Sequence, residues 1–385
     1  MRSELREIVE TLERIERPSA SAGEREAAEW ICDRFRALGL AVRIEEEPAH
    51  GTYWWPLGLL SAAAALAGLS GSSRLGTIAG VAAAAGIADD VSGGPHLFRR
   101  LLPQRTTCNV VAEAGDPAAP RTLVFLAHHD AAHGGLVFAD ELITVPADLA
   151  PGIYARIETS PMIMQLVVAG PALVAVGALT DRRRLRALGT AIALGCVAAF
   201  ADIGLRRVVP GANDNLTAVA ATLETARSVA ADPPGGLRVI FVSTGSEESF
   251  MEGMRGFARR HFGSLDRATT RFICLEALGS PELLVIEGEG MIRMTDYPQA
   301  DRDFLAACAE RAGEPLRRGL RLGLSTDGLI ALRAGFPTAV LASCTKYKFP
   351  SNYHSRHDTA ANVDFGTLEA AVRVCREVVR ASAVA

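Results

Sequence analysis

The stretch TLVFLAHHDAAHGG, residues 122–135, joins an apolar run to three histidines, an aspartate and two glycines. The run TLVFLA lacks the polar alternation of a half-exposed strand, which is typical of a strand covered on both faces of a sheet. Polar residues that follow such a strand lie at its carboxyl end, where open α/β sheets form their sites. The stretch therefore predicts an α/β fold and a site that begins at His128.

The alternation of strands and helices continues along the chain. Further strand-like runs are LAVRIEEE, TCNVVAEA, LRVIFVST, TRFICLEA and FPTAVLAS. Apolar residues at helical spacing occur near 3–15, 22–38, 216–230, 252–261, 300–312, 326–334 and 366–381. This order predicts a mostly parallel mixed sheet that is flanked by helices.

Composition excludes several classes of protein. The chain has 385 residues and a formal net charge of −4, so we expect no nucleic-acid partner. Seven cysteines are scattered singly without a CxxC pair, which argues against a disulfide framework and a thiolate zinc site. The charged, amphipathic first 20 residues lack the apolar core of a secretory signal. These features indicate a reducing compartment.

Two apolar blocks, 53–90 and 161–205, interrupt the α/β pattern. In the second block, the apolar runs 161–179 and 187–200 flank the basic turn TDRRRLR, which predicts a transmembrane hairpin because a spanning helix needs about 20 apolar residues. The first block opens with aromatic residues typical of a membrane interface and is interpreted as a further membrane hairpin. The alternative is an apolar lid or dimer face. The α/β domain then comprises 1–52, 91–160 and 206–385.

Histidines and carboxylates recur at the ends of the strand-like runs and in the loops. They are His128 with Asp130, Asp214 in PGANDNLTAVA, Glu247 and Glu248 in STGSEESFMEG, Glu276 in CLEALGS, and His354 in NYHSRHDT. Each motif alone is ordinary, since GANDN is typical of a turn and paired glutamates of a helix start. Together, imidazoles and carboxylates without cysteine indicate a hydrolytic zinc pair with a neighbouring glutamate as base.

The order and wording of these motifs resemble the M28 family of zinc metallopeptidases, which includes aminopeptidases and glutamate carboxypeptidases. AHHD, GANDN, EESFMEG and YHSRHDT match the family's motifs, as does the intervening STDGLIALRAGFPTAVL. SASAGEREAAEWICDRFRALGLAVRIEE resembles the family's opening helix and strand. The resemblance covers almost everything except the two apolar blocks, and it implies a zinc exopeptidase fold.

The resemblance also implies how two Zn²⁺ ions are held. His128 and Glu276 would bind one ion, Glu248 and His354 would bind the other, and Asp214 would bridge them. Other divalent metals could take their place.

The remaining roles follow from the same resemblance. Glu247 would be the general base. Asp130 would not bind the metal itself but would orient one of the residues that do. Asp358 would support the His354 loop, and Asp327 would line the site.

Two positions depart from the family's pattern. The family usually has aspartate at the position of Glu276, so the added methylene requires the metal or the strand to shift slightly. In EESFMEG the first glycine of the family's EExGLxG is left out, which changes the packing of the loop but leaves both carboxylates in place.

Membrane topology is constrained by the two ends of the second block. His128 precedes the block and Asp214 follows it, so an even number of crossings is required for them to meet. The basic turn TDRRRLR would lie in the cytoplasm by the positive-inside rule, which places the catalytic domain outside. The opposite orientation follows from the missing signal sequence, the cysteine usage and the flanking Arg99, Arg100, Arg206 and Arg207. We expect a membrane-associated protein with a cytoplasmic catalytic domain.

The leading functional hypothesis is a membrane-associated dizinc exopeptidase, specifically an aminopeptidase acting on peptide or aminoacyl substrates. Three alternatives use the same fold. One is a glutaminyl-cyclase-like activity with one zinc ion, and another is a non-catalytic membrane adaptor. The third is a carboxypeptidase or dipeptidase, whose substrate carboxylate would need Arg293, Arg321 or Arg356. The apolar blocks are also compatible with a homodimer.

Overall fold

A seven-stranded mixed sheet lies at the centre of the computed structural model, which describes residues 1–384. Its four central strands are mutually parallel, whereas the strands at both edges pair antiparallel. The strands in spatial order are β1 (Ala41–Ala49), β2 (Arg105–Gly115), β4 (Leu237–Thr244), β3 (Arg121–His128), β5 (Thr270–Glu276), β10 (Thr338–Cys344) and β6 (Glu282–Val285). All six predicted strands are present, and the predicted fold class is confirmed.

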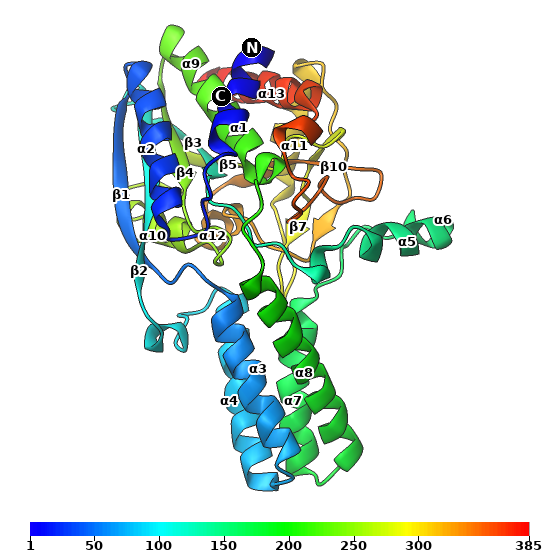
Figure 1. Cartoon of the computed structure of the whole chain (residues 1–385). Helices are drawn as coiled ribbons and strands as arrows, with labels where there is room; N and C mark the ends of the chain where they lie inside the picture. The colour runs from blue at the N-terminus through cyan, green and yellow to red at the C-terminus, as the bar shows by residue number, and fades with distance from the viewer. Residues whose placement is uncertain (385) are drawn as a thin grey trace.

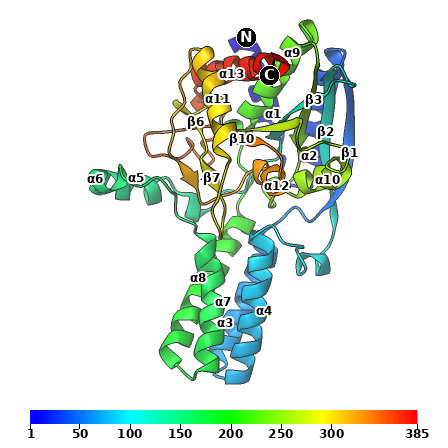
Figure 2. The ribbon, with the colours of Figure 1, turned by 180° about the vertical axis from the view of Figure 1, so that it is seen from behind.

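Helices cover both faces of this sheet, as Figures 1 and 2 show. Strand β3 illustrates the reason, because Leu123 and Phe125 pack into one apolar cluster while Val124 and Leu126 pack into the other. The first cluster includes side chains of α1 (Arg2–Leu12), α2 (Ala22–Ala37), α9 (Thr217–Ala231), α11 (Gln299–Arg311) and α13 (Phe365–Val384), and the second includes α10 (Glu252–His261) and α12 (Gly328–Arg333).

Local signals explain where helices begin. Ser21 accepts a hydrogen bond from the backbone N–H of Glu24 (3.1 Å), and the Glu24 carboxylate accepts one from the N–H of Ala20 (2.8 Å). This pair of hydrogen bonds satisfies one amide in the first turn of α2 and one in the chain that leads into it. Short elements were not predicted, namely β6, the small sheet of β7 (Gly288–Glu289), β8 (Thr295–Asp296) and β9 (Arg321–Leu322), and the turns η1 (Arg99–Leu101), η2 (Leu136–Phe138), η3 (Ala212–Leu216) and η4 (Ala360–Asn362).

The two apolar blocks form two helical hairpins that pack together as one four-helix stalk, which projects from the α/β body (Figure 1). Its helices are α3 (Trp54–Leu69), α4 (Ser73–Val91), α7 (Met164–Leu179) and α8 (Arg183–Leu205). Glycines allow close contact within it. A Cβ on Gly80 would lie 2.7 Å from the carbonyl oxygen of Pro171, and one on Gly189 would lie 2.5 Å from the backbone nitrogen of Val174.

The outer surface of the stalk is apolar. Helix α8 is, within residues 1–384, the one helix that is both long and apolar enough to cross a membrane, while α3 and α7 are shorter apolar helices. Large apolar side chains exposed on the stalk are Trp55, Leu59, Leu66, Leu69, Leu75, Ile78, Val81, Leu166, Val176, Leu179, Leu188, Leu194 and Leu205. Such a surface is unusual for a helix bundle in water.

A short helical arm leaves the body beside the stalk and runs sideways (Figures 1 and 2). It consists of α5 (Glu141–Leu149) and α6 (Pro151–Tyr154), which the sequence did not predict. The Lys348 ammonium holds its end by donating hydrogen bonds to the carbonyl oxygens of Tyr154 (2.8 Å) and Ile157 (2.7 Å).

Candidate metal centre

The polar residues predicted from the sequence meet at one edge of the sheet. Because β3, β4, β5 and β10 are parallel, their carboxyl ends point the same way, toward the stalk. His128 ends β3, Glu276 ends β5, and the glutamate pair follows β4. We define the His–carboxylate cluster as His128, Asp214, Glu247, Glu248, Glu276 and His354.

Asp214 lies between the two histidines of the cluster. Its Oδ1 is 3.3 Å from His128 Nε2, and its Oδ2 is 3.4 Å from His354 Nε2. Glu276 Oε1 is 3.5 Å from His128 Nε2, and Glu248 Oε2 is 3.2 Å from His354 Nε2. The cluster therefore contains two groups of three residues that share one aspartate.

The geometry of both groups fits zinc. Tetrahedral zinc with bonds of 2.0–2.2 Å holds its ligand atoms roughly 3.4 Å apart, which is close to all four distances. The buried Glu248 Oε1 has no hydrogen-bond partner. Within residues 1–384, no lysine or arginine forms an ion pair with a carboxylate of the cluster. A buried group of carboxylates of this kind needs positive charge, which divalent cations would supply.

Glu247 occupies a distinct position in the cluster. Its carboxylate lies within 4.8 Å of ligand atoms of both His128 and Glu248, but it forms no ion pair with a histidine. Burial raises the pKa of Glu247 well above its ordinary value. A carboxylate that faces the site without pairing to a histidine suits proton transfer.

Asp130 orients two parts of the cluster at once. Its Oδ1 accepts a hydrogen bond from the backbone N–H of Glu247 (3.0 Å) and lies 3.3 Å from His128 Nδ1. Its Oδ2 accepts hydrogen bonds from the N–H of Glu248 (3.2 Å) and from Ser19 Oγ (2.6 Å). The fully buried Asp130 thus holds His128 and the glutamate loop in a fixed relation.

Asp358 and Asp327 lie behind the cluster. Asp358 accepts hydrogen bonds from the N–H groups of Asn213 (2.7 Å) and Asp214 (3.0 Å), so its carboxylate supports the Asp214 loop more directly than the His354 loop. Asp327 accepts a hydrogen bond from Thr244 Oγ1 at the end of β4.

Sequence reasoning missed Arg17 as a support of the site. This fully buried arginine donates to the carbonyl oxygens of His129 (2.8 Å), Pro210 (2.7 Å) and Gly211 (2.8 Å). It therefore connects the loop after His128 with the loop before Asp214. Its only sequence signal is a charged residue in a short loop between two helices, which does not distinguish it from a surface arginine.

The other two histidines of the opening stretch have partners outside the cluster. The ring of His129 is buried and its Nδ1 lies 3.0 Å from Ser243 Oγ, while His133 Nδ1 donates to the carbonyl oxygen of Arg206 (2.7 Å). Of the three, His128 alone pairs with the cluster carboxylates.

Burial and charge shift the titration of the site. Burial raises the pKa of Glu276 to about 8 and that of Asp327 to about 7. Burial alone would lower the pKa of His354, but Glu248 and Asp214 raise it to about 10. Without cations the cluster therefore retains protons, and metal binding would release them.

The three arginines considered for a substrate carboxylate do not contact the cluster. Arg321 pairs with Asp296 in the small sheet (2.8 Å), and Arg356 hydrogen-bonds to His357 (3.3 Å). No hydrogen bond or ion pair joins Arg293 to another side chain within residues 1–384.

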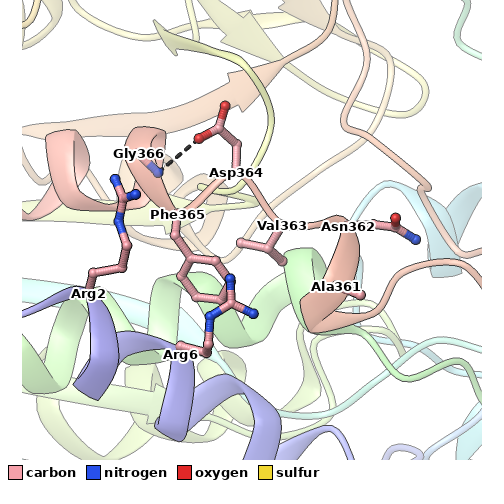
Figure 3. Close-up of a pocket in the computed structure, with 8 residues that line it drawn as sticks. All are labelled: Arg2, Arg6, Ala361, Asn362, Val363, Asp364, Phe365 and Gly366. Carbon is pink, nitrogen blue, oxygen red and sulfur yellow. Dashed lines mark hydrogen bonds between the residues drawn. The ribbon is translucent and has the colours of Figure 1, made fainter.

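A shallow pocket lies elsewhere on the body, between α1 and the start of α13 (Figure 3). Arg2, Arg6 and Asp364 line it, and the guanidinium of Arg6 stacks over the ring of Phe365 at 4.3 Å. It contains no residue of the His–carboxylate cluster.

Known proteins resemble this chain in sequence over part of its length and in fold over nearly all of it. Residues 196–379 match the model of Peptidase family M28, a range that contains all of the cluster except His128. No curated protein matches the chain. A Zn-dependent exopeptidase from Parabacteroides distasonis is similar in structure, with a TM-score of 0.58 and 13% identity over 98% of this chain and 97% of that chain.

Two further solved structures share the fold. A leucine aminopeptidase precursor from Bacteroides thetaiotaomicron has a TM-score of 0.58 and 14% identity over 98% of this chain and 96% of that one. A glutaminyl cyclase from the same organism has a TM-score of 0.59 and 14% identity over 98% and 97%. The family match confirms the predicted resemblance, while these structural likenesses show the fold.

Proposed function

We propose that this chain, a zinc metallopeptidase whose residues 196–379 belong to Peptidase family M28, is a dizinc aminopeptidase anchored in a membrane by its stalk. The observation that carries the proposal is the position of Asp214, which presents one oxygen to each of two histidine–carboxylate groups. We assign His128 and Glu276 to one ion and Glu248 and His354 to the other, with Asp214 between them.

The chemistry divides between the ions and the protein. When bound, paired zinc ions activate water and stabilise negative charge that develops on a peptide carbonyl. The Glu247 carboxylate accepts the proton of the attacking water and returns it to the leaving amine. Asp130 keeps Glu247 in reach by holding the backbone of the glutamate loop. The products are an amino acid and a peptide shortened by one residue.

Replacing the base tests this assignment. Glu247→Gln keeps the size of the side chain but cannot take up the proton, so we expect aminopeptidase activity to fall by roughly 10²–10⁴-fold while two zinc ions per chain are retained. Zinc content by mass spectrometry and hydrolysis of an aminoacyl anilide provide the two measurements. Glu310→Gln, at an exposed position of α11, is the matched control. Full activity of Glu247→Gln would refute the assignment.

Cyclisation of N-terminal glutamine is the second candidate, because glutaminyl cyclases are among the proteins of similar structure. The presence of two complete ligand groups favours the dizinc hydrolase over a reaction that needs one ion. Assaying a glutaminyl peptide and an aminoacyl anilide on one preparation, together with zinc per chain, separates the two. An N-blocked dipeptide tests carboxypeptidase activity, and a preparation that binds no metal would indicate an adaptor.

The stalk supports membrane association. Helix α8 has 23 residues and is therefore about 35 Å long, enough to cross a hydrocarbon layer of about 30 Å. The exposed side chains along the stalk are apolar, while its far end carries the polar turn 70–73 and the basic turn 180–184. We therefore propose that 53–90 and 161–205 are membrane hairpins and that 1–52, 91–160 and 206–385 form the catalytic domain.

We place the catalytic domain on the cytoplasmic side. All seven cysteines are free and buried, which suits a reducing compartment. The arginines of the basic turn and of the first residues of α8 favour the opposite orientation by the positive-inside rule. A homodimer that covers the stalk is the alternative to lipid, and the molecular mass of the detergent-solubilised chain distinguishes a monomer from that dimer.

A further inference from the structure

The loop that carries Glu247 and Glu248 has an unfavourable backbone. Ser246, Phe250 and Met251 adopt left-handed conformations with φ of 51°, 64° and 58°. Side chains other than glycine rarely adopt this region, and they remain there when the surrounding structure holds them. The contacts around residues 246–251 therefore show what keeps the two glutamates in place.

The α/β body holds the first half of this loop. Glu24 Oε2 accepts hydrogen bonds from Ser246 N–H (2.9 Å) and Ser246 Oγ (2.8 Å). The amides of Glu247 and Glu248 donate to Asp130. These contacts end before Ser249.

The stalk holds the second half through an aromatic contact. The ring of Phe250 stacks on the ring of Tyr53 with a centroid distance of 5.1 Å and an interplanar angle of 28°. Tyr53 immediately precedes α3, and its ring also meets that of Phe200 in α8 at 6.3 Å. Tyr53 and Phe250 are each 8% exposed. Through Tyr53, Phe250 therefore connects the glutamate loop to the start of α3 and to Phe200 of α8.

Arg99, which lies in η1, adds a polar connection between α4 and the glutamate loop. Its side chain is fully buried, and Nη1 donates to both the carbonyl oxygen and Oγ of Ser249, each at 2.9 Å. Its Nε lies 2.6 Å from Asp90 Oδ1 near the end of α4, and its guanidinium lies 5.1 Å from the ring centroid of Phe250. Ser249 directly follows Glu248, so this contact lies one residue from a proposed zinc ligand.

We propose that Tyr53, Arg99 and Phe250 form a stalk clasp that positions Glu247 and Glu248 for catalysis. The assignment of chemistry to these glutamates rests on the proposed function, but the clasp itself rests on the contacts above. A glycine at position 250 would adopt φ of 64° without strain, but it would provide no ring to stack on Tyr53. The stacking explains why a bulky residue is tolerated there. The stalk is therefore a part of the active-site scaffold as well as an anchor.

The first arm of the test measures loop order. Phe250→Gly relieves the backbone strain and removes the ring, but it also adds backbone freedom to the loop. Tyr53→Ala removes the stacking partner and leaves the loop sequence unchanged, so this variant separates loss of the clasp from added freedom. In the full chain in lipid nanodiscs, we expect hydrogen exchange of the amides of 246–252 to become faster by on the order of tenfold. Tyr53→Ala should have the same effect, and Tyr53→Phe, which keeps the ring, should not. Phe304→Ala, which removes a ring from α11, should leave exchange of 246–252 unchanged.

The second arm measures zinc release to a coloured chelator. We expect Phe250→Gly and Tyr53→Ala to release zinc on the order of tenfold faster than the wild type, because Glu248 is held less firmly. Tyr53→Phe and Phe304→Ala should release zinc at the wild-type rate. Unchanged exchange in Tyr53→Ala would overturn the proposal whatever Phe250→Gly does, and so would faster exchange with unchanged zinc release.

These results remain distinct from the proposed function. If the wild type binds zinc but hydrolyses no peptide, the aminopeptidase proposal fails, while exchange and zinc release still decide the clasp. If the wild type binds no zinc, the dizinc proposal fails, and hydrogen exchange alone then tests the clasp.

Discussion

Asp214 shows how much of the candidate centre depends on one side chain. Its two oxygens lie 3.3 and 3.4 Å from different histidines, so both ligand groups are incomplete without it.

Glu276 shows that the site tolerates a longer side chain at one ligand position. Its extra methylene, relative to the family's aspartate, still leaves Oε1 3.5 Å from His128 Nε2. The cluster has accommodated the longer side chain.

Restoring the family's residue at this position should weaken the site. Glu276 pairs with Ala342 in the sheet, so its backbone is fixed, and Glu276→Asp would withdraw the carboxylate by about 1.5 Å. Zinc tolerates errors of about 0.2 Å in ligand distance. We expect one of two zinc ions to bind roughly tenfold more weakly or worse, as measured by zinc titration. Glu282→Asp at the exposed start of β6 is the control, and unchanged affinity would mean that β5 moves.

Asp130 should matter for rate more than for folding. Asp130→Asn has nearly the same shape but presents one oxygen, so it cannot accept hydrogen bonds from both Glu247 and Glu248 amides. We expect kcat to fall by roughly 10–100-fold, with circular dichroism unchanged. Asp303→Asn on the exposed face of α11 should retain full activity. Equal rates in the two variants would remove Asp130 from the positioning role.

At the scale of elements, the loop and helix that follow β4 connect the parts of the molecule. The first turn of α10 contains Glu252, whose carboxylate accepts hydrogen bonds from the N–H groups of His50 and Gly51. Arg99 Nη1 lies 3.4 Å from the same carboxylate. The linker into α3, the loop after α4 and helix α10 therefore meet at one buried glutamate. Its acidic side chain also suits the amino end of a helix.

Glu252 should make stability depend on pH. Burial alone would raise its pKa, but hydrogen bonds from His50 and the charge of Arg99 lower the pKa of Glu252 to about 2. This pKa lies below that of a glutamate in the unfolded chain, which is about 4.3. The ionised form therefore stabilises the fold, and its contribution is fully present above about pH 4.3. The contribution is lost as pH falls toward 2.

Glu252→Gln tests this dependence by chemical denaturation in detergent. We expect the free energy of unfolding at pH 7 to fall by on the order of 2–3 kcal/mol. The difference from the wild type should shrink as pH falls from about 4.5 to about 2. Glu310→Gln should show no such trend, and a difference that is constant with pH would contradict the lowered pKa.

At the scale of the whole molecule, the carboxyl ends of the central strands face the stalk, so the candidate centre lies on the side of the body from which the helices leave (Figure 1). His128 and Asp214 are separated in sequence by the second hairpin but lie side by side in space. A hairpin that leaves the body and returns to it on the same side accounts for both their separation in sequence and their proximity in space. A protein anchored in this way would present its active site close to the membrane surface.

Site-specific labelling should reveal this arrangement. All seven native cysteines are buried, so a new surface thiol can be labelled selectively. We expect Asp181→Cys, in the turn between α7 and α8, to react with an impermeant maleimide from outside intact cells. Glu310→Cys on the body should react after the membrane is opened. Reaction of both from one side would refute a spanning stalk, and the reverse pattern would place the catalytic domain outside.

The sequence by itself determined the strands, most helices of the body, the two apolar hairpins and the identity of the metal-binding candidates. These features depend on short-range physics. Apolar runs such as TLVFLA have to be buried, Ser21 and Glu24 cap a helix within four residues, and imidazole with carboxylate has the ligand chemistry of zinc.

Only the tertiary structure decided how these pieces act together. The joining of two hairpins into one stalk depends on contacts such as that of Gly80 with Pro171, and the glutamate loop depends on Glu24, Arg99 and Tyr53. The arm of α5 and α6 consists of two short helices, and Pro146 lies inside the first. Such contacts join residues that are far apart in sequence, and their energies depend on a geometry that no local pattern encodes.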